Sequence, residues 1–94
     1  MDLMDLKRYL INIFEEDDLS LFLFGSRSRG DHAPNSDIDI GILPHRPLDP
    51  KKLTLLREWV EHQNIPQKVE MVDLSLVSEQ FKEQALKDAE WWKG

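Results

Sequence analysis

A short apolar strand that runs directly into a glycine-serine turn constrains the fold of this chain most strongly. Residues 21–24 are continuously apolar and are followed at once by Gly25-Ser26. A short apolar run that ends at a glycine is typical of a strand buried on both faces. A second apolar run, residues 38–43, carries Asp37 and Asp39 at its start. We expect the rest of the chain to support these two segments.

The composition predicts a single folded domain that spans residues 1–94. A chain of 94 residues with 40% hydrophobic residues is typical of one small globular domain. No apolar run approaches the roughly 18 residues of a membrane span, and the acidic start of the chain lacks the basic segment of a signal peptide. With no cysteine, the chain has neither a disulfide framework nor a thiolate metal site. We therefore expect a cytoplasmic protein with no membrane partner.

The net charge of −6 argues against nucleic acid as a direct partner. Binding to a nucleic acid backbone requires clustered lysine and arginine side chains. The acidity favours solubility in the first place. It does not exclude a small anionic ligand that is held by a local site.

Periodicity and capping signals predict the helices. Apolar residues at helical spacing predict an amphipathic helix from residue 3 to about residue 16. Ser26 is predicted to cap a short helix that runs through about residue 30. Asp49, followed by proline, predicts the start of a helix that ends near residue 64. A final helix is predicted from Ser78 onward, with an apolar stripe formed by Phe81, Ala85, Ala89 and Trp92.

Three segments are predicted to be strands, namely residues 19–24, 37–43 and 67–74. The element order is then α-β-α-β-α-β-α. We predict an α/β or α+β fold in which helices flank a small mixed β-sheet, because the connections allow either strand direction. Trp91 and Trp92 cannot both face the core from one helix, so one of them is expected to be exposed, which indicates either a partner surface or a frayed terminus.

Asp37 and Asp39 form the first candidate site. Alternate side chains of a strand share a face, so these two carboxylates lie on one side, roughly 6.6 Å apart along the strand. Such a pair can bracket one hard cation or two neighbouring cations. Without a cation the two carboxylates repel each other. An exposed strand edge that discourages aggregation would show the same pattern.

The turn before this pair is a candidate phosphate site. Gly25 allows a tight turn, and Ser26 with the following amides begins a helix, where N–H groups and the dipole favour an anion. Arg27 and Arg29 add positive charge nearby. A phosphate site followed by two metal-binding carboxylates is the arrangement required for phosphoryl or nucleotidyl transfer.

The segments Gly25-Ser26-Arg27-Ser28-Arg29-Gly30 and Ser36-Asp37-Ile38-Asp39-Ile40 closely resemble the signature of the DNA polymerase β-like nucleotidyltransferase superfamily. Within it, the chain is similar to the minimal nucleotidyltransferase (MNT) group. The resemblance implies the nucleotidyltransferase fold, an NTP substrate and two Mg²⁺ ions. It also implies that Gly25 and Ser26 bind the triphosphate and that Asp37 and Asp39 ligate both metal ions.

The resemblance further implies a third carboxylate on a later strand, where this chain departs from the family pattern. Alignment of residues 68–73 places Glu70 at the position of the usual aspartate. Glu70 would complete the metal site or act as general base toward an acceptor hydroxyl. Asp73 is the competing candidate, and since the two residues face opposite ways in a strand, only one should reach the site.

These features predict a Mg²⁺-dependent enzyme that transfers AMP from ATP to an acceptor hydroxyl and releases pyrophosphate. Arg27 or Arg29 would offset the phosphate charge. The resemblance implies a helical partner of the HEPN type, a toxin on which an antitoxin of the MNT group AMPylates a tyrosine. The oligomeric state, whether homo-oligomer or hetero-oligomer, is left open.

Two other functions fit the sequence. The chain could be a binding module that neutralises a HEPN-like partner by contact, with a catalytically weak NTP site. The glutamate at position 70 and the aromatic C-terminal end favour this alternative. Transfer to a small molecule such as an aminoglycoside is disfavoured, because the chain has no room for an acceptor domain.

Overall fold

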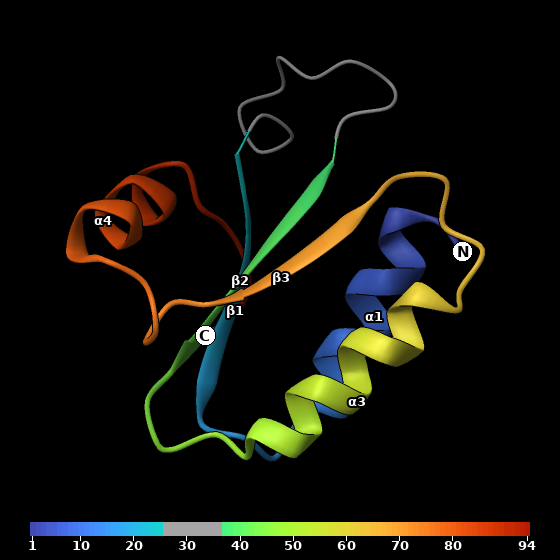
Figure 1. The fold of residues 1–94 in the computed structure, drawn as a ribbon, viewed down its shortest axis with the longest axis horizontal. Coiled ribbons are helices and arrows are strands. Elements are labelled where there is room, and N and C mark those ends of the chain that lie inside the picture. Colours follow the sequence, from blue (N-terminus) through green and yellow to red (C-terminus); the bar gives the residue numbers. More distant parts are fainter. Residues whose placement is uncertain (26–36) are drawn as a thin grey trace.

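A computed structural model describes residues 1–25 and 37–94 of the chain. Its elements are α1 (Leu3–Ile13), β1 (Leu19–Phe24), β2 (Ile38–Pro44), α3 (Pro50–Glu61), β3 (Val69–Asp73), α4 (Glu79–Lys87) and β4 (Glu90–Lys93). Helices α1 and α3 cover one face of the sheet, and α4 lies on the other face (Figure 1). No described helix combines the length and the apolar character needed to cross a membrane. The short helix predicted at residues 26–30 lies outside the described residues.

The described strands form one mixed sheet in the order β3-β2-β1-β4. Strand β1 is antiparallel to both β2 and β4, whereas β2 and β3 are parallel. The predicted fold class, a small mixed sheet flanked by helices, is therefore confirmed. The central strand β1 is buried along its whole length, as its apolar sequence predicted. Within the part of the chain that is described, β3 and β4 are the two edges.

The main core lies between the sheet and the helices α1 and α3. The side chain of Asp49 accepts a hydrogen bond from Lys51 N at 3.0 Å, which caps α3 as the sequence predicted. Tyr9 of α1 stacks on Trp59 of α3, with ring centroids 3.7 Å apart. The buried members of this core are aliphatic except for Phe14 and Met71: Leu6, Leu10, Phe14, Leu19, Leu21, Leu23, Ile38, Ile40, Ile42, Leu53, Leu56, Val60 and Met71.

A smaller, partly aromatic core lies on the opposite face, under α4. Its buried members are Phe22, Phe24, Leu74 and Ala85. The ring of Phe22 fills the space above Gly41, where an added Cβ would approach the ring to 2.3 Å. The side chain of Ser78 caps α4 as predicted, by accepting a hydrogen bond from Phe81 N at 3.1 Å.

The predicted element order is wrong at its C-terminal end. The final helix stops at Lys87, and Glu90–Lys93 pair with β1 as an edge strand. In a strand, adjacent tryptophans point to opposite faces: Trp91 packs on Phe22, whereas Trp92 packs against the main core. Trp91 is 51% exposed, so the prediction that one tryptophan of the pair is exposed is confirmed.

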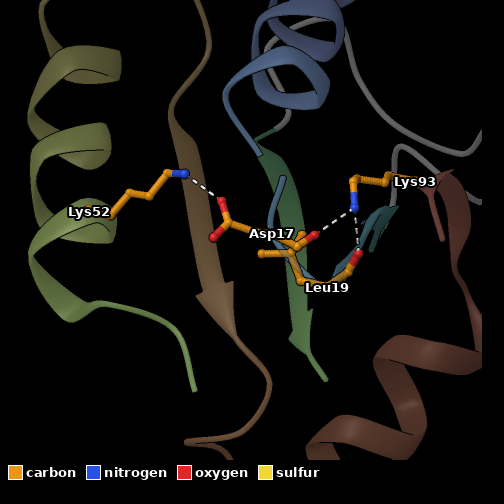
Figure 2. Close-up of polar contacts among 4 residues, drawn as sticks. All are labelled: Asp17, Leu19, Lys52 and Lys93. Carbon is orange, nitrogen blue, oxygen red and sulfur yellow. Dashed lines mark hydrogen bonds and ion pairs between the residues drawn. The ribbon is translucent and has the colours of Figure 1, made fainter. Parts of the chain in front are cut away.

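A polar network fastens β4 and α3 to the loop between α1 and β1 (Figure 2). Lys93 Nζ donates hydrogen bonds to the backbone oxygens of Asp17 (2.9 Å) and Leu19 (3.1 Å). The carboxylate of Asp17 forms an ion pair with Lys52 of α3. Asp17 thus connects the edge strand β4 with the helix α3.

Candidate functional site

The parallel pairing of β2 and β3 places two acidic residues next to each other. Asp39 and Glu70 are direct partners in the register of the two strands. Their neighbours Ile40 and Met71 are buried in the main core. Since side chains alternate along a strand, Asp39 and Glu70 both lie on the other face of the sheet, the one that carries α4. Asp39 is half-buried and Glu70 is exposed.

The neighbouring acidic residues affect the pKa of Asp39. Burial raises the pKa of this carboxyl above its ordinary value, and the negative charges of Glu70 and then Asp37 raise it further. Asp37 is exposed and directly precedes β2. The three carboxylates therefore lie close enough to repel one another, and a bound cation would relieve this repulsion.

Gly25 lies directly beside the Asp39 carboxylate. It follows β1, whose last residue, Phe24, is paired with Asp39. Gly25 has a φ of 79°, in the left-handed region that glycine adopts without strain. A Cβ at this position would lie 2.6 Å from Asp39 Oδ2. The glycine therefore permits the backbone to pass the carboxylate closely at the start of the predicted phosphate loop.

The remaining residues of the predicted phosphate site, Ser26, Arg27 and Arg29, lie outside the described residues. Their roles stay predictions. Within residues 1–25 and 37–94, the structure brings together Gly25, Asp37, Asp39 and Glu70 from three separate chain segments.

Asp73, the competing third carboxylate, is not beside Asp39. It pairs with Ile42, three positions further along the ladder. Its Oδ1 atom accepts hydrogen bonds from Ser75 N at 2.9 Å and from Ser75 Oγ at 2.6 Å. The side chain of Asp73 thus stabilises the turn that follows β3, and Glu70 is the carboxylate next to Asp39.

Glu70 has a cationic neighbour that the sequence interpretation missed. Lys68 Nζ lies 2.9 Å from Glu70 Oε1, with both side chains largely exposed. The hydrogen bond and the negative charge of Glu70 raise the pKa of Lys68. The signal was present in the sequence, because residues two apart in a strand share a face. This ion pair places a positive charge beside the acidic group.

The acidic residues fit a Mg²⁺ ion that is shared with phosphate oxygens. Mg²⁺ prefers oxygen ligands and is usually held by one or two carboxylates together with substrate phosphates. Asp37 and Asp39 supply such carboxylates, and their mutual repulsion is the cost that a cation would offset. Among the described residues, no group of three His, Cys, Asp or Glu side chains is arranged to hold a metal ion. The fit is therefore to a two-carboxylate site that a nucleotide completes.

Comparisons with known proteins show the family of this chain and its fold. The family model described as "Polymerase beta, Nucleotidyltransferase" matches residues 8–91. The Haemophilus influenzae protein named "Probable protein adenylyltransferase MntA" is 33% identical over 66 residues, which cover 70% of this chain and 58% of that protein. The chain thus matches less than two thirds of this curated relative's length.

Solved structures show the same fold. A chain in the crystal structure of a toxin-antitoxin with AMP-PNP is 27% identical and superposes with a TM-score of 0.72, covering 94% of this chain and 73% of that one. A chain in the structure of a tri-AMPylated Shewanella oneidensis HEPN toxin in complex with MNT antitoxin is 23% identical, with a TM-score of 0.66 and coverage of 97% and 71%. At this lower identity, the second likeness concerns the fold alone.

Proposed function

This chain belongs to the polymerase beta nucleotidyltransferase family, and from that premise we propose that it transfers AMP from ATP to a hydroxyl group of a protein partner. The observation that carries the proposal is the convergence of Asp37, Asp39 and Glu70 beside Gly25. Carboxylates next to a phosphate-binding turn are the arrangement that this reaction needs.

In the proposed reaction, the acceptor oxygen attacks the α-phosphorus of ATP and forms a new phosphate ester. The bond between the α-phosphorus and the oxygen that bridges to the β-phosphate breaks, and pyrophosphate leaves. The acceptor proton passes to a carboxylate, for which Glu70 is the candidate because it is exposed and, unlike Asp37, is not assigned to the metal ion. Mg²⁺, when bound, neutralises charge on the phosphate oxygens.

Each residue then has a proposed role. Asp37 and Asp39 hold Mg²⁺, with a second ion expected from the family resemblance. The backbone at Gly25, with Ser26, holds the phosphates, and Arg27 or Arg29 offsets their charge. Glu70 either receives the proton or completes the metal site.

The proposed acceptor is a helical protein of the HEPN type. Two relatives support this choice: one is named as a protein adenylyltransferase, and one belongs to a toxin-antitoxin structure with AMP-PNP. The net charge of −6 also favours a protein over a nucleic acid as acceptor. The chain would act as the antitoxin by modifying a tyrosine of its partner.

The experiment mixes the purified chain with a candidate HEPN-type protein, ATP and Mg²⁺, and measures the mass of the partner. A gain of one or more AMP units supports the proposal. The double variant Asp37→Asn with Asp39→Asn should form the complex but transfer at least about a thousandfold more slowly, since metal-borne charge stabilisation contributes several kcal/mol. Unimpaired transfer by this variant would exclude the proposed metal site.

The second candidate is a binding module that neutralises the partner by contact alone. The Lys68–Glu70 ion pair favours it, because Lys68 competes with a metal ion or an acceptor hydroxyl for the Glu70 carboxylate. The same experiment separates the two functions. A stable complex with an unchanged partner mass would support the binding module.

A further inference from the structure

Strand β3 has an outer edge whose hydrogen-bonding groups can be assigned from its pairing with β2. Lys68 O accepts from Ile38 N at 2.8 Å, and Leu74 N donates to Ile42 O at 2.9 Å. In a parallel ladder, alternate residues direct their peptide groups to the same neighbour. Even-numbered residues of β3 therefore face β2. The outward-facing peptide groups belong to Val69, Met71 and Asp73.

The outward carbonyl groups of this edge are hydrogen-bonded at the C-terminal end of β3 and, among the described residues, free at its start, which is here called the open end. Arg57 Nη2 of α3 donates to Met71 O at 2.7 Å, and Leu76 N donates to Asp73 O at 3.1 Å. At Val69, neither the N–H nor the C=O has a hydrogen-bond partner within the described part of the chain. Val69 is paired with Ile38, between Asp37 and Asp39. The open end is thus the end beside the carboxylates.

A groove follows the same edge. It has a volume of about 320 Å³ and is lined by Arg57 and Glu61 of α3 and by residues 68–72. Glu70 therefore belongs both to the acidic group and to the wall of the groove. A chain segment in the groove could hydrogen-bond to Val69 and present a side chain to Glu70 at the same time.

We propose that the open end of the β3 edge binds an extended segment of the acceptor protein as an added strand, and that this contact brings the acceptor hydroxyl to Glu70. The inference rests on the proposed function and adds to it the surface on which the acceptor docks. The main-chain groups of Val69 supply two hydrogen bonds that do not depend on the partner's sequence. The side chains of the groove then select the hydroxyl-bearing residue.

The partial closure of the edge favours a short acceptor segment over a second copy of this chain. Pairing of two β3 strands along their length would have to displace Arg57 from Met71 O. A segment that pairs only near Val69 leaves this hydrogen bond intact. It also leaves the ladder between β2 and β3 unchanged, since Val69 uses neither of its peptide groups there.

The substitution Val69→Pro tests the edge. Proline removes the outward N–H and places its ring where the added strand would lie, and it is tolerated at edge positions whose N–H faces away from the sheet. The matched control is Val69→Ala, which trims the same half-buried side chain but keeps the N–H. Both variants retain Asp37, Asp39 and Glu70.

Three quantities are measured for each variant with the same candidate HEPN-type protein: KM for that protein, kcat, and the Kd for ATP with Mg²⁺. We expect Val69→Pro to raise KM at least about tenfold, because a main-chain hydrogen bond is lost and the edge is blocked. The kcat and the Kd for ATP should stay within about twofold of the wild type, and Val69→Ala should resemble the wild type throughout. Equal KM values for the two variants would overturn the inference.

Two further outcomes separate this inference from the proposed function. If the wild type binds ATP but transfers nothing, the proposed function fails. The edge is then judged by the Kd of the complex with the same protein, which Val69→Pro should weaken and Val69→Ala should not. If the wild type is a dimer by sedimentation and Val69→Pro is a monomer, a second copy occupies the edge and the inference is wrong.

Discussion

The two faces of the sheet differ in what covers them and in what they can carry. Helices α1 and α3 cover one face and bury its core, which consists mainly of aliphatic side chains. The other face is covered by α4 over a small core with two phenylalanines. The acidic group, Asp37, Asp39 and Glu70, lies on this second face, where Asp39 is paired with Phe24. The difference indicates that one face supplies most of the stability and the other carries the chemistry.

The comparison also explains why the carboxylates are tolerated. Adjacent acidic side chains in a fully covered core would be strongly destabilising, because burial disfavours the charged form. On the face with α4, Asp39 is only half-buried, while Asp37 and Glu70 are exposed. Incomplete cover thus limits the cost of placing acidic side chains here, and it leaves room for a charged ligand.

The largest predicted effect measures the difference in stability between the two faces directly. Leu56 of α3 is 2% exposed in the main core. Leu86 of α4 is partly buried at the small core. We expect Leu56→Ala to lower the free energy of unfolding by about 2–5 kcal/mol, and Leu86→Ala by about 1 kcal/mol, because the cost follows the burial and the cavity left behind. Urea-induced unfolding measures both, and equal costs would refute the comparison.

The next prediction concerns Gly25, which follows the buried strand β1 and lies beside the Asp39 carboxylate. A Cβ here would meet Asp39 Oδ2 at 2.6 Å, on a backbone with a φ of 79°. We expect Gly25→Ala to weaken Mg²⁺-dependent ATP binding at least about tenfold, since a left-handed alanine alone costs roughly 1–2 kcal/mol. Equilibrium dialysis with ATP provides the measurement.

Gly94 offers the matched control for this substitution. It also has a positive φ, of 97°, and its Cβ would meet Ser20 rather than a carboxylate. Gly94→Ala should therefore strain the backbone and leave ATP binding unchanged. If both variants lost ATP binding to the same extent, general destabilisation would explain the effect and the role of Gly25 would be disproved.

Local signals allowed most of the fold to be predicted from the sequence. The caps at Asp49 and Ser78 lie within a few residues of the helices they start, so sequence alone identifies them. Strand β4 was missed because the spacing of Ala85, Ala89 and Trp92 continues a helical pattern. Its strand conformation depends on pairing with β1, which is distant in the sequence.

The site was predictable to the extent that it depends on spacing along one strand. The shared face of Asp37 and Asp39, and the expectation that only one of Glu70 and Asp73 reaches the site, both follow from alternation of side chains. The preference for Glu70 came from the family resemblance. The parallel register, which makes Glu70 the partner of Asp39, could not be predicted, because the sequence allowed either strand direction. The groove and the contact of Arg57 with Met71 depend on that register as well.

The smallest predicted effect is a gain of stability on the face that carries the carboxylates. The folded-state pKa of Asp39 is raised, so the folded protein binds its proton more tightly than the unfolded chain does. The sign follows from linkage: the contribution of Asp39 to the free energy of unfolding is greatest at low pH and is lost as the pH rises through its raised pKa. At pH 7 without Mg²⁺, Asp39→Asn should therefore raise the Tm by about 1–3 °C, a fraction of the roughly 4–8 °C per kcal/mol of a small domain. The difference in Tm between the variant and the wild type should shrink as the pH falls toward the ordinary aspartate pKa of about 3.9. Mg²⁺ with ATP should raise the Tm of the wild type but not that of the variant. If Asp39→Asn has the lower Tm at pH 7 without Mg²⁺, the Asp39 carboxylate is not under repulsion.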